Sequence, residues 1–365
     1  MADQNELLSK LAPLRDQIDE IDDAILNLLD KRARLAVEVG EIKKKYGSDS
    51  DVLKPERETI IFKSLSQKAE VFPSEAVQNV WTEIISACRG LERKLKVAYL
   101  GPSGSFSEIA AYKIYGHYID TISCVTFEEV FKSVESKVAD VGVVPVENST
   151  EGTVNTTQDL FLGSKLKIHS ECDVEVHHCL LHKTGDISNA KKLFVHPQTR
   201  GQCHKWISNN LPNIEIVTAR SNSEAAHMAS TDSASLAIAS ESAAIIYDLK
   251  CIHHGVQDSS NNKTRFVGIG YINPKPSGND KTSLIFAASN EAGSVYKLLN
   301  PFAECGVSMS RLESRPFKNG EWEYYFYVDL LGHAEDQNVK KALNVLLKSE
   351  APFVKVLGSY PATRS

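Results

Sequence analysis

The sequence lacks any apolar run long enough to span a bilayer and any pair of cysteines with CxxC spacing. Its seven cysteines are scattered and odd in number, which favours reduced thiols in a cytoplasmic protein over a disulfide framework or a zinc site. Residues 1–10 are polar and acidic, so we expect no secretory signal. Repeats of solenoid period and low-complexity segments are absent as well. We therefore expect a cytoplasmic globular protein without a bound metal.

Charge is also limited. The formal net charge is -6, so the surface as a whole does not attract nucleic acid or anionic lipid. An anionic substrate would have to be held by local cations. A length of 365 residues indicates two or three domains.

The first segment, residues 1–95, carries an apolar seam typical of a long helix. The seam ends near Gly47 and consists of Leu11, Leu14, Ile18, Ile21, Ile25, Leu28, Leu35, Val39 and Ile42. Arg32 occupies the position where the next seam residue is expected, and a cation there is costly unless it is paired. Arg32 either extends to the seam edge or binds a carboxylate inside a helical bundle.

Helical geometry gives the distances between three cations of this helix. Lys43 follows Arg32 by nearly three full turns, so the two face one side at roughly 16 Å separation. Arg15 precedes Arg32 by roughly 25 Å on a straight helix, too far for one small diacid to reach both. Arg15 joins the same pocket only if a second copy packs antiparallel, which predicts a dimer with shared sites.

Two further helices are expected after this one. Pro55 suits the first helical position of the second, and Ser74 is a candidate N-cap for the third, on which Glu92 follows Cys88 by one turn. With the phrase Leu35-Ala36-Val37-Glu38-Val39-Gly40 and the run Pro55-Glu56-Arg57-Glu58, residues 7–95 resemble the all-helical chorismate mutase family. The resemblance implies a substrate-binding set of Arg15 from the partner chain, Arg32, Lys43, Arg57, Glu58 and Cys88, with Glu92 facing the ether oxygen. Two positions depart from the family: Lys54 replaces an aspartate, and Cys88 replaces a serine.

The implied mutase reaction is a pericyclic rearrangement that needs no nucleophile and no cofactor. The protein must hold two carboxylates in the reactive conformer and stabilise charge that grows on the ether oxygen. Lys43 and a protonated Glu92 suit the second task. Mutase activity should then weaken as pH rises and Glu92 ionises.

The second segment, residues 96–273, alternates strand-like and helical runs, which predicts α/β architecture with mostly parallel sheets. Strands are expected at 97–100, 141–146, 174–181, 193–195, 214–218, 236–239 and 266–271. Polar residues lie where several of these runs begin or end, and a polar loop, residues 261–265, leads into the last of them.

Three motifs of this segment resemble the prephenate dehydratase family: Thr264-Arg265-Phe266, the stretch Val143-Val144-Pro145-Val146-Glu147-Asn148-Ser149, and the loop Gly101-Pro102-Ser103-Gly104-Ser105-Phe106-Ser107. A Thr-Arg pair alone is more often a solvated turn. The resemblance implies two lobes around a cleft, as in periplasmic binding proteins, with crossings near residues 173–177 and near Arg265.

The implied reaction turns prephenate into phenylpyruvate by loss of carbon dioxide and water. Thr264 is the leading candidate beside the ring hydroxyl, and Arg265 either holds the side-chain carboxylate or stabilises the loop. The other expected cleft residues are Ser105, Ser107, Glu147, Asn148, Ser149, Gln198, Ser221, Asn262 and Phe266. Ser221 also reads as a plain helix cap. His177 and His178 are candidate acids, although histidines in strands are more often structural.

The third segment follows a Pro/Gly-rich linker, residues 273–278. Strands at 283–288, 308–314, 322–330 and 354–359 and helices at 295–304 and 337–347 give a βαββαβ order, which suggests a ferredoxin-like sandwich. Residues 280–365 resemble an ACT domain, a paired amino-acid sensor. Glu313-Ser314-Arg315-Pro316 matches a motif at the phenylalanine site, whereas Gly293-Ser294-Val295-Tyr296 keeps only the glycine of a second motif. Use for dimerisation alone is the alternative.

The order mutase, dehydratase, sensor resembles the bifunctional P-protein family of phenylalanine biosynthesis. This resemblance implies conversion of chorismate to prephenate and then to phenylpyruvate, inhibition by L-phenylalanine, and a homodimer or larger homo-oligomer. A monofunctional dehydratase with a helical dimerisation segment is one alternative. A two-lobed ligand receptor is another.

Overall fold

The computed structural model describes residues 2–47, 53–259, 261–316, 324–349 and 351–363. Three helices come first: α1 (Ala2–Lys45), α2 (Pro55–Lys68) and α3 (Ser74–Glu92). The predicted stops and starts fit, since Gly47 has a left-handed φ of 70° and Pro55 lies in the first turn of α2. The prediction that Ser74 caps α3 is wrong, because Pro73 is the N-cap and Ser74 is the first helical residue.

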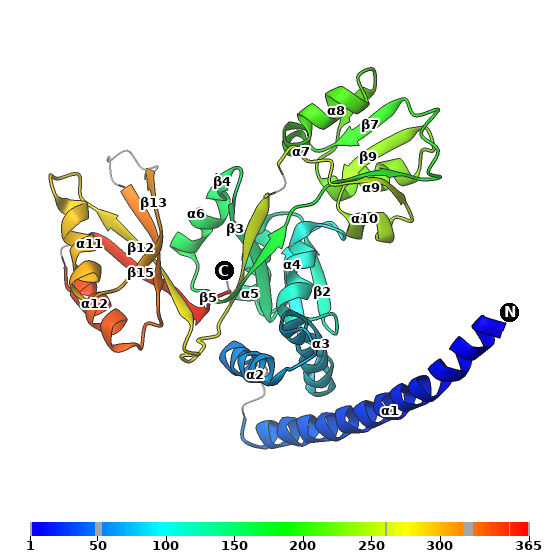
Figure 1. Ribbon diagram of the computed structural model, residues 1–365. Helices are drawn as coiled ribbons and strands as arrows, with labels where there is room; N and C mark the ends of the chain where they lie inside the picture. The colour runs from blue at the N-terminus through cyan, green and yellow to red at the C-terminus, as the bar shows by residue number, and fades with distance from the viewer. Residues whose placement is uncertain (1, 48–52, 260, 317–323, 350, 364–365) are drawn as a thin grey trace.

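Helix α1 extends away from the remainder of the molecule and packs on α3 near its C-terminal end (Figure 1). The contact is close, because a Cβ added to Gly40 would lie 2.8 Å from Cγ of Glu92. Most of the predicted seam is exposed: Leu14, Ile21 and Leu28 show 56%, 58% and 63% of their surface. A single chain thus leaves a long apolar helical face uncovered.

Two sheets follow α3. The first has the order β2-β1-β3-β11-β5, with β4 paired to β3. Its strands are β1 (Lys96–Leu100), β2 (Asp120–Cys124), β3 (Val141–Asn148), β4 (Gly152–Thr153), β5 (Lys167–Glu175) and β11 (Lys263–Gly270), accompanied by α4 (Phe106–Tyr115), α5 (Phe127–Glu135) and α6 (Asn155–Gly163).

The second sheet has the order β10-β6-β9-β7-β8. Its strands are β6 (Cys179–His182), β7 (Lys192–Val195), β8 (Glu215–Thr218), β9 (Ser235–Ala239) and β10 (Lys250–His254), and its helices are α7 (Pro197–Gln202), α8 (His204–Asn210), α9 (Asn222–Ser230) and α10 (Glu241–Ile246).

The expectation of mostly parallel sheets is wrong, because both sheets are mixed. Strands β1, β2 and β3 run parallel, whereas β11 is antiparallel to β3 and to β5. The cause is that the chain leaves the first sheet after β5 and returns to it through β11. The strand predicted at 174–181 is accordingly split between the two sheets, as β5 and β6.

The polar loop expected at 261–265 is shorter than predicted. Strand β11 begins at Lys263, so Thr264 and Arg265 already lie in the strand. They are held there because β11 is paired on both sides, with Thr264 opposite Asn148 of β3 and Val174 of β5. Successive side chains of a strand face opposite sides, so Thr264 and Arg265 point away from each other.

The third sheet has the order β13-β14-β12-β15 and carries two helices, which is the ferredoxin-like arrangement. Its elements are β12 (Asp280–Ala288), α11 (Ser294–Glu304), β13 (Met309–Pro316), β14 (Tyr324–Leu331), α12 (Gln337–Leu347) and β15 (Phe353–Pro361). The predicted start of one strand at Trp322 lies outside the described residues.

The first and third sheets share one hydrophobic core. Ile285 and Leu357 of the third sheet belong to the same buried cluster as Val144 and Val267 of the first. In Figure 1 the third sheet lies beside β5 and α6, on the far side of the first sheet from the second. Among the residues that the structure describes, no helix is both long and apolar enough to cross a membrane.

Candidate active sites

A buried amide joins the adjacent strands β3 and β11. The Asn148 side-chain nitrogen donates to Thr264 Oγ1 and to Asn262 Oδ1, both at 2.8 Å. Asn148 Oδ1 accepts from the backbone amides of Thr150 and Glu151, at 3.0 and 3.1 Å, and so fixes which end of the amide faces Thr264. Because Thr264 Oγ1 already accepts a hydrogen bond, its own proton is left to donate elsewhere.

This cluster reaches the second sheet through Gln202, at the end of α7. Gln202 Oε1 accepts from Asn262 Nδ2 at 3.2 Å, and Gln202 Nε2 donates to Glu151 Oε1 at 3.0 Å. The Gln198 side chain also donates to Glu151. Gln202 and Glu151 were not among the predicted site residues. The sequence held a signal for Gln202, because it follows Gln198 by four residues and therefore shares one face of a helical turn.

His178 lies at the same junction, 3.0 Å from Gln202 Oε1 through Nε2. Burial lowers the pKa of His178, so its imidazole is neutral near pH 7. Since Gln202 Oε1 only accepts, Nε2 carries the proton. These contacts give His178 the task of orienting Gln202. His177 is exposed and pairs with Glu175 at 3.1 Å.

The predicted serines mostly bind backbone. Ser105 and Ser221 cap α4 and α9 by accepting from the amides of Glu108 and Glu224. Ser149 Oγ donates to the Asn261 carbonyl at 3.0 Å. Ser107 is buried in α4.

The loop before α4 also docks on the second sheet's helices. Ser240 Oγ donates to the Gly104 carbonyl at 2.8 Å. Gly104 has a φ of 82°, and a Cβ there would lie 2.9 Å from Cα of Ala243. Only glycine allows this approach.

Arg265 faces the third sheet. Its Nε donates to Glu171 Oε2 at 2.8 Å, its Nη1 to Asp329 Oδ2 at 2.5 Å, and its Nη2 to the Tyr360 hydroxyl at 2.8 Å. Glu171 also accepts from Lys281 Nζ at 2.9 Å, so it joins β5 to β12 as well.

Charge in this network is balanced by its neighbours. Burial disfavours the charged guanidinium of Arg265. Tyr360, Asp329 and Glu171 more than offset this effect, so the pKa of Arg265 is raised. Burial also works against the Asp329 carboxylate, but Arg265 and the Ser283 hydroxyl outweigh it and lower the pKa of Asp329. Both groups are therefore ionised at neutral pH.

Two more predicted cleft residues lie away from Thr264. Glu147, which pairs with Arg265 across the strands, lies 3.4 Å from Arg311 Nε of the third sheet. Phe266 is 2% exposed and packs in the core under α4. The alternation of side chains along β3 and β11 accounts for Arg265 and Glu147, since both lie on the face opposite Thr264 and Asn148.

The predicted mutase residues are only partly gathered. Lys43 Nζ lies 3.2 Å from Glu92 Oε2, across the contact of α1 with α3. Arg32 Nη1 is 3.5 Å from the Ile84 carbonyl on the same helix pair. Cys88 is buried in α3, whereas Arg15 and Arg57 are exposed.

Glu58 is held by a residue that the sequence did not single out. Arg89 Nη1 lies 3.0 Å from Glu58 Oε1, and Arg89 Nη2 donates to the Tyr115 carbonyl of α4 at 2.6 Å. Burial raises the pKa of Glu58, and the cations Arg89 and Arg32 only partly offset it. Through Arg89, Glu58 thus connects α2 to α4, a helix that accompanies the first sheet.

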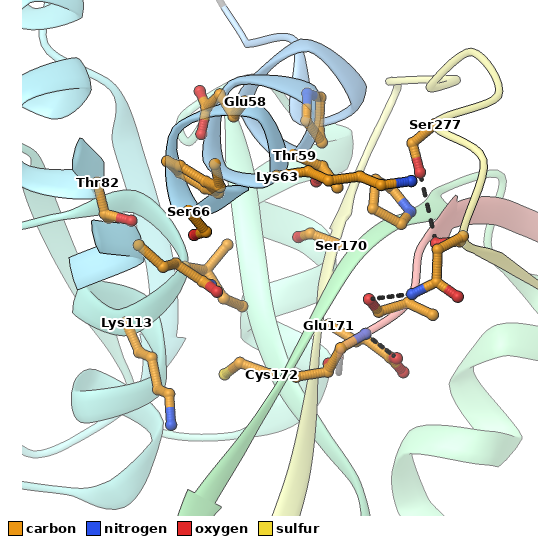
Figure 2. A pocket seen from close by; sticks show the side chains of 18 of the residues that line it. Glu58, Thr59, Lys63, Ser66, Thr82, Lys113, Ser170, Glu171, Cys172 and Ser277 are labelled. Carbon is orange, nitrogen blue, oxygen red and sulfur yellow. Dashed lines mark hydrogen bonds between the residues drawn. The ribbon is translucent and has the colours of Figure 1, made fainter. Parts of the chain in front are cut away.

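A cavity of about 580 Å³ lies beside this contact, between α2, α3, α4, β5 and the C-terminal segment. Figure 2 shows Glu58 and Lys63 of α2 on one side and Ser170, Glu171 and Cys172 of β5 on the other. Arg32, Lys43 and Glu92 do not line it. The cavity therefore marks the junction of the helical unit with the first sheet's unit.

The predicted sensor residues divide between two elements of the third sheet. Gly293 has a φ of 80° and precedes α11, which contains Val295. On β13, Arg315 Nη2 donates to Asp159 of α6 at 2.6 Å and Glu313 accepts from Arg311. Ser314, between them, is exposed.

Comparison with known proteins identifies the chain. A chorismate mutase type II model matches residues 14–93, and a prephenate dehydratase model matches residues 97–273. The bifunctional chorismate mutase/prephenate dehydratase of Aquifex aeolicus (strain VF5) is 43% identical over 359 residues, covering 97% of this chain and 98% of that one. The protein of the same description from Neisseria gonorrhoeae (strain ATCC 700825 / FA 1090) is 42% identical, covering 96% and 97%.

A solved structure of a prephenate dehydratase is also similar to this chain. Prephenate dehydratase from Arthrobacter aurescens in complex with L-Phe is 31% identical with a TM-score of 0.67, covering 73% of this chain and 90% of that one.

These matches define an enzyme that joins a helical mutase to an α/β dehydratase. The chain belongs to the bifunctional chorismate mutase/prephenate dehydratase family. It converts chorismate to prephenate and prephenate to phenylpyruvate, two steps of phenylalanine biosynthesis. The family that the motifs predicted is confirmed.

Proposed function

We propose that residues 1–95 carry out the mutase step, residues 96–273 the dehydratase step, and residues 280–365 form an ACT domain that regulates the second. The first two sheets would act as the lobes of the dehydratase cleft. The observation that carries this proposal is the hydrogen-bond cluster of Asn148, Asn262 and Thr264, which lies where the chain crosses between the two sheets.

For the mutase step, Lys43 and Glu92 hold the end of the site nearest the ether oxygen. Without substrate they pair with each other. A bound substrate competes for the Lys43 ammonium, and Glu92 then takes up a proton and donates a hydrogen bond to the ether oxygen. Arg32 supplies a fixed cation for a carboxylate. Glu58, which the family resemblance places in the substrate-binding set, is paired with Arg89 in the absence of substrate.

We propose a homodimer as the working unit. The exposed seam of α1 is supported as the interface by its length and by the size of its side chains. A second copy packed antiparallel would cover this face and bring its Arg15 to the Arg32 site. The seam therefore explains both an apolar surface and a site that is incomplete in one chain.

For the dehydratase step, Thr264 faces the ring hydroxyl of prephenate. Asn148 holds Thr264 Oγ1 as an acceptor, so the Thr264 proton points to the substrate. That hydrogen bond stabilises negative charge growing on the leaving oxygen, which departs with its bonding electrons and takes a proton from solvent to become water. The ring carboxylate leaves as carbon dioxide, and the electrons of its broken bond make the ring aromatic. Glu151 and Gln202 join the two sheets around the substrate.

L-phenylalanine is proposed as the inhibitor, bound by the third sheet's unit near Gly293, Val295 and residues 313–315. The L-Phe complex of the Arthrobacter aurescens dehydratase supports a phenylalanine effector. Arg265 connects the proposed phenylalanine site to the proposed dehydratase site, because it is hydrogen-bonded to Asp329 and Tyr360 of the third sheet and is adjacent to Thr264 in β11. We further propose that the enzyme acts in the cytoplasm, which suits seven free cysteines.

A steady-state assay tests the proposal. Chorismate is supplied without metal or nucleotide, and prephenate and phenylpyruvate are followed with and without L-phenylalanine. Both products should form, and L-phenylalanine should slow the second step alone. If L-phenylalanine leaves both rates unchanged, the regulatory assignment fails. If prephenate forms and phenylpyruvate does not, the proposed dehydratase site is wrong.

A further inference from the structure

Two thiols and an imidazole converge at the edge of the second sheet. Cys179 lies on β6, and Cys251 and His254 lie on the neighbouring edge strand β10. One ligand atom from each residue lies within 4.8 Å of the other two. Cys179 is buried, Cys251 is partly buried and His254 is exposed, so the cluster opens to solvent on one side.

A β-bulge in β10 creates the convergence. Cys179 is paired with His254 and Leu181 with Cys251, and the register shifts between Cys251 and His253. In a regular strand, residues three apart face opposite sides of the sheet. The extra residue turns Cys251 and His254 to the same face as Cys179, and bulges re-aim side chains in this way next to functional sites.

We propose that Cys179, Cys251 and His254 bind one Zn²⁺ ion per chain. Tetrahedral zinc with Zn–S of about 2.3 Å and Zn–N of about 2.1 Å places a sulfur and a nitrogen ligand roughly 3.6 Å apart. The Cys179 Sγ to His254 Nδ1 distance is 3.6 Å. The side chains are thus spaced as zinc ligands before any ion is bound.

The three side chains leave the fourth position of a tetrahedral site to a water molecule. Zinc binds thiols as thiolates, so binding of the ion displaces the two thiol protons.

The ion has a structural role. It fixes edge strand β10 to β6, and the chain runs from β10 through residues 255–262 to Thr264. None of the three ligands is among the residues proposed to bind substrate, so we expect dehydratase turnover without metal. The sequence did not suggest the site because Cys179 comes from a distant part of the chain, although Cys251-x-x-His254 has metal-ligand spacing.

The test uses the full chain, stripped with a chelator and kept reduced. Calorimetric titration with Zn²⁺ should give one ion per chain and raise the melting temperature. Titration with Co²⁺ should give the d–d bands of a tetrahedral ion and a thiolate charge-transfer band. Cys251→Ser and His254→Ala should each weaken Zn²⁺ binding by at least about 100-fold, because loss of a ligand exceeds the 10–100-fold typical of an outer-shell partner.

Two matched variants control the experiment. His253→Ala removes the adjacent histidine, which faces the other side of β10 against Trp206, and Cys305→Ser removes a thiol of the third sheet's unit. Both should bind Zn²⁺ like the wild type. Phenylpyruvate formation without metal reports whether each variant is folded. The proposal is overturned if the wild type binds no more tightly than Cys251→Ser, or if Co²⁺ shows no thiolate band.

Discussion

Thr264 and Arg265 are consecutive residues of β11 that serve opposite faces of the first sheet. Thr264 Oγ1 lies 2.8 Å from Asn148 Nδ2, beside the junction with the second sheet. Arg265 Nη1 lies 2.5 Å from Asp329 Oδ2 of the third sheet. The residue proposed to donate a hydrogen bond to the substrate is therefore adjacent in sequence to the residue that forms an ion pair with the proposed regulatory domain.

Removing the charge of Asp329 should uncouple regulation from turnover. Asp329→Asn keeps the size of the side chain but leaves Arg265 with one buried anion fewer, at a stability cost on the order of 3 kcal/mol. We expect uninhibited phenylpyruvate formation to persist and the L-phenylalanine concentration for half-inhibition to rise about tenfold or more. Rates measured against L-phenylalanine concentration give this value.

Asp140→Asn is the control for that variant, because Asp140 pairs with Arg93 at 2.8 Å outside the Arg265 network. It should leave inhibition unchanged. An Asp329→Asn enzyme with wild-type inhibition would contradict the proposed route through Arg265.

The role proposed for Glu92 predicts a pH-dependent mutase. The wild-type kcat/KM for chorismate should fall as pH rises, because only the protonated carboxyl donates to the ether oxygen. Glu92→Gln donates at every pH and should give a flatter profile. Glu83→Gln, which alters an exposed carboxylate of the same helix, should follow the wild type. A flat wild-type profile together with an unaffected Glu92→Gln enzyme would remove Glu92 from the mechanism.

A site shared between chains predicts complementation. Arg15→Ala and Lys43→Ala homodimers should both lose mutase activity, since each damages both sites. After refolding as a mixture, heterodimers hold one site with both defects and one with neither. Mutase activity should then recover to about a quarter of the wild-type rate, because half the dimers have one intact site of two. Mixtures that recover nothing would place Arg15 outside the shared site.

Much of the fold could be predicted because its signals are local. The α1 seam, the first turn of α2 at Pro55 and the βαββαβ order of the third segment follow from periodicity and from residues adjacent in sequence. The mixed sheets could not be predicted in this way, because strand direction depends on where the chain crosses between sheets. Strand β5 was predicted only at its end, since the buried polar side chains of His169 and Glu171 interrupt its apolar pattern.

The candidate sites likewise combine features that local motifs predict with contacts that only the fold creates. The proximity of Asn148, Asn262 and Thr264 follows from motifs that end or begin adjacent strands. The partners of Arg265 and Glu58 lie in other units of the chain, so only the folded structure brings them together. Side-chain alternation alone, however, places Thr264 and Arg265 on opposite faces of one strand.

Buried histidines predict a loss of stability in acid. Burial lowers the pKa of His169 from 6.5 to about 3, and that of His178 is lowered as well. The folded state keeps them neutral while the unfolded chain takes up protons below about pH 6.5. The free energy of unfolding should therefore fall as pH drops below 6.5. His169 should contribute up to about 1.4 kcal/mol per pH unit down to about pH 3, and His178 should add to the loss below pH 6.5.

Urea denaturation at several pH values measures this slope. His169→Gln should reduce the slope by up to about 1.4 kcal/mol per pH unit, which corresponds to one proton taken up on unfolding. Replacement of the exposed His204 should not change the slope. Equal slopes for His169→Gln and the wild type would show that His169 does not supply this linkage.

The two reactions of this enzyme are proposed to use separate residues, and Thr264→Ala tests this directly. With chorismate as the substrate, the variant should form prephenate at the wild-type rate and lose phenylpyruvate formation by about 100-fold or more. The Thr264→Ser enzyme keeps the hydroxyl and should retain most of the second step. Near-normal phenylpyruvate formation by Thr264→Ala, or loss of both steps in a folded protein, would contradict the account.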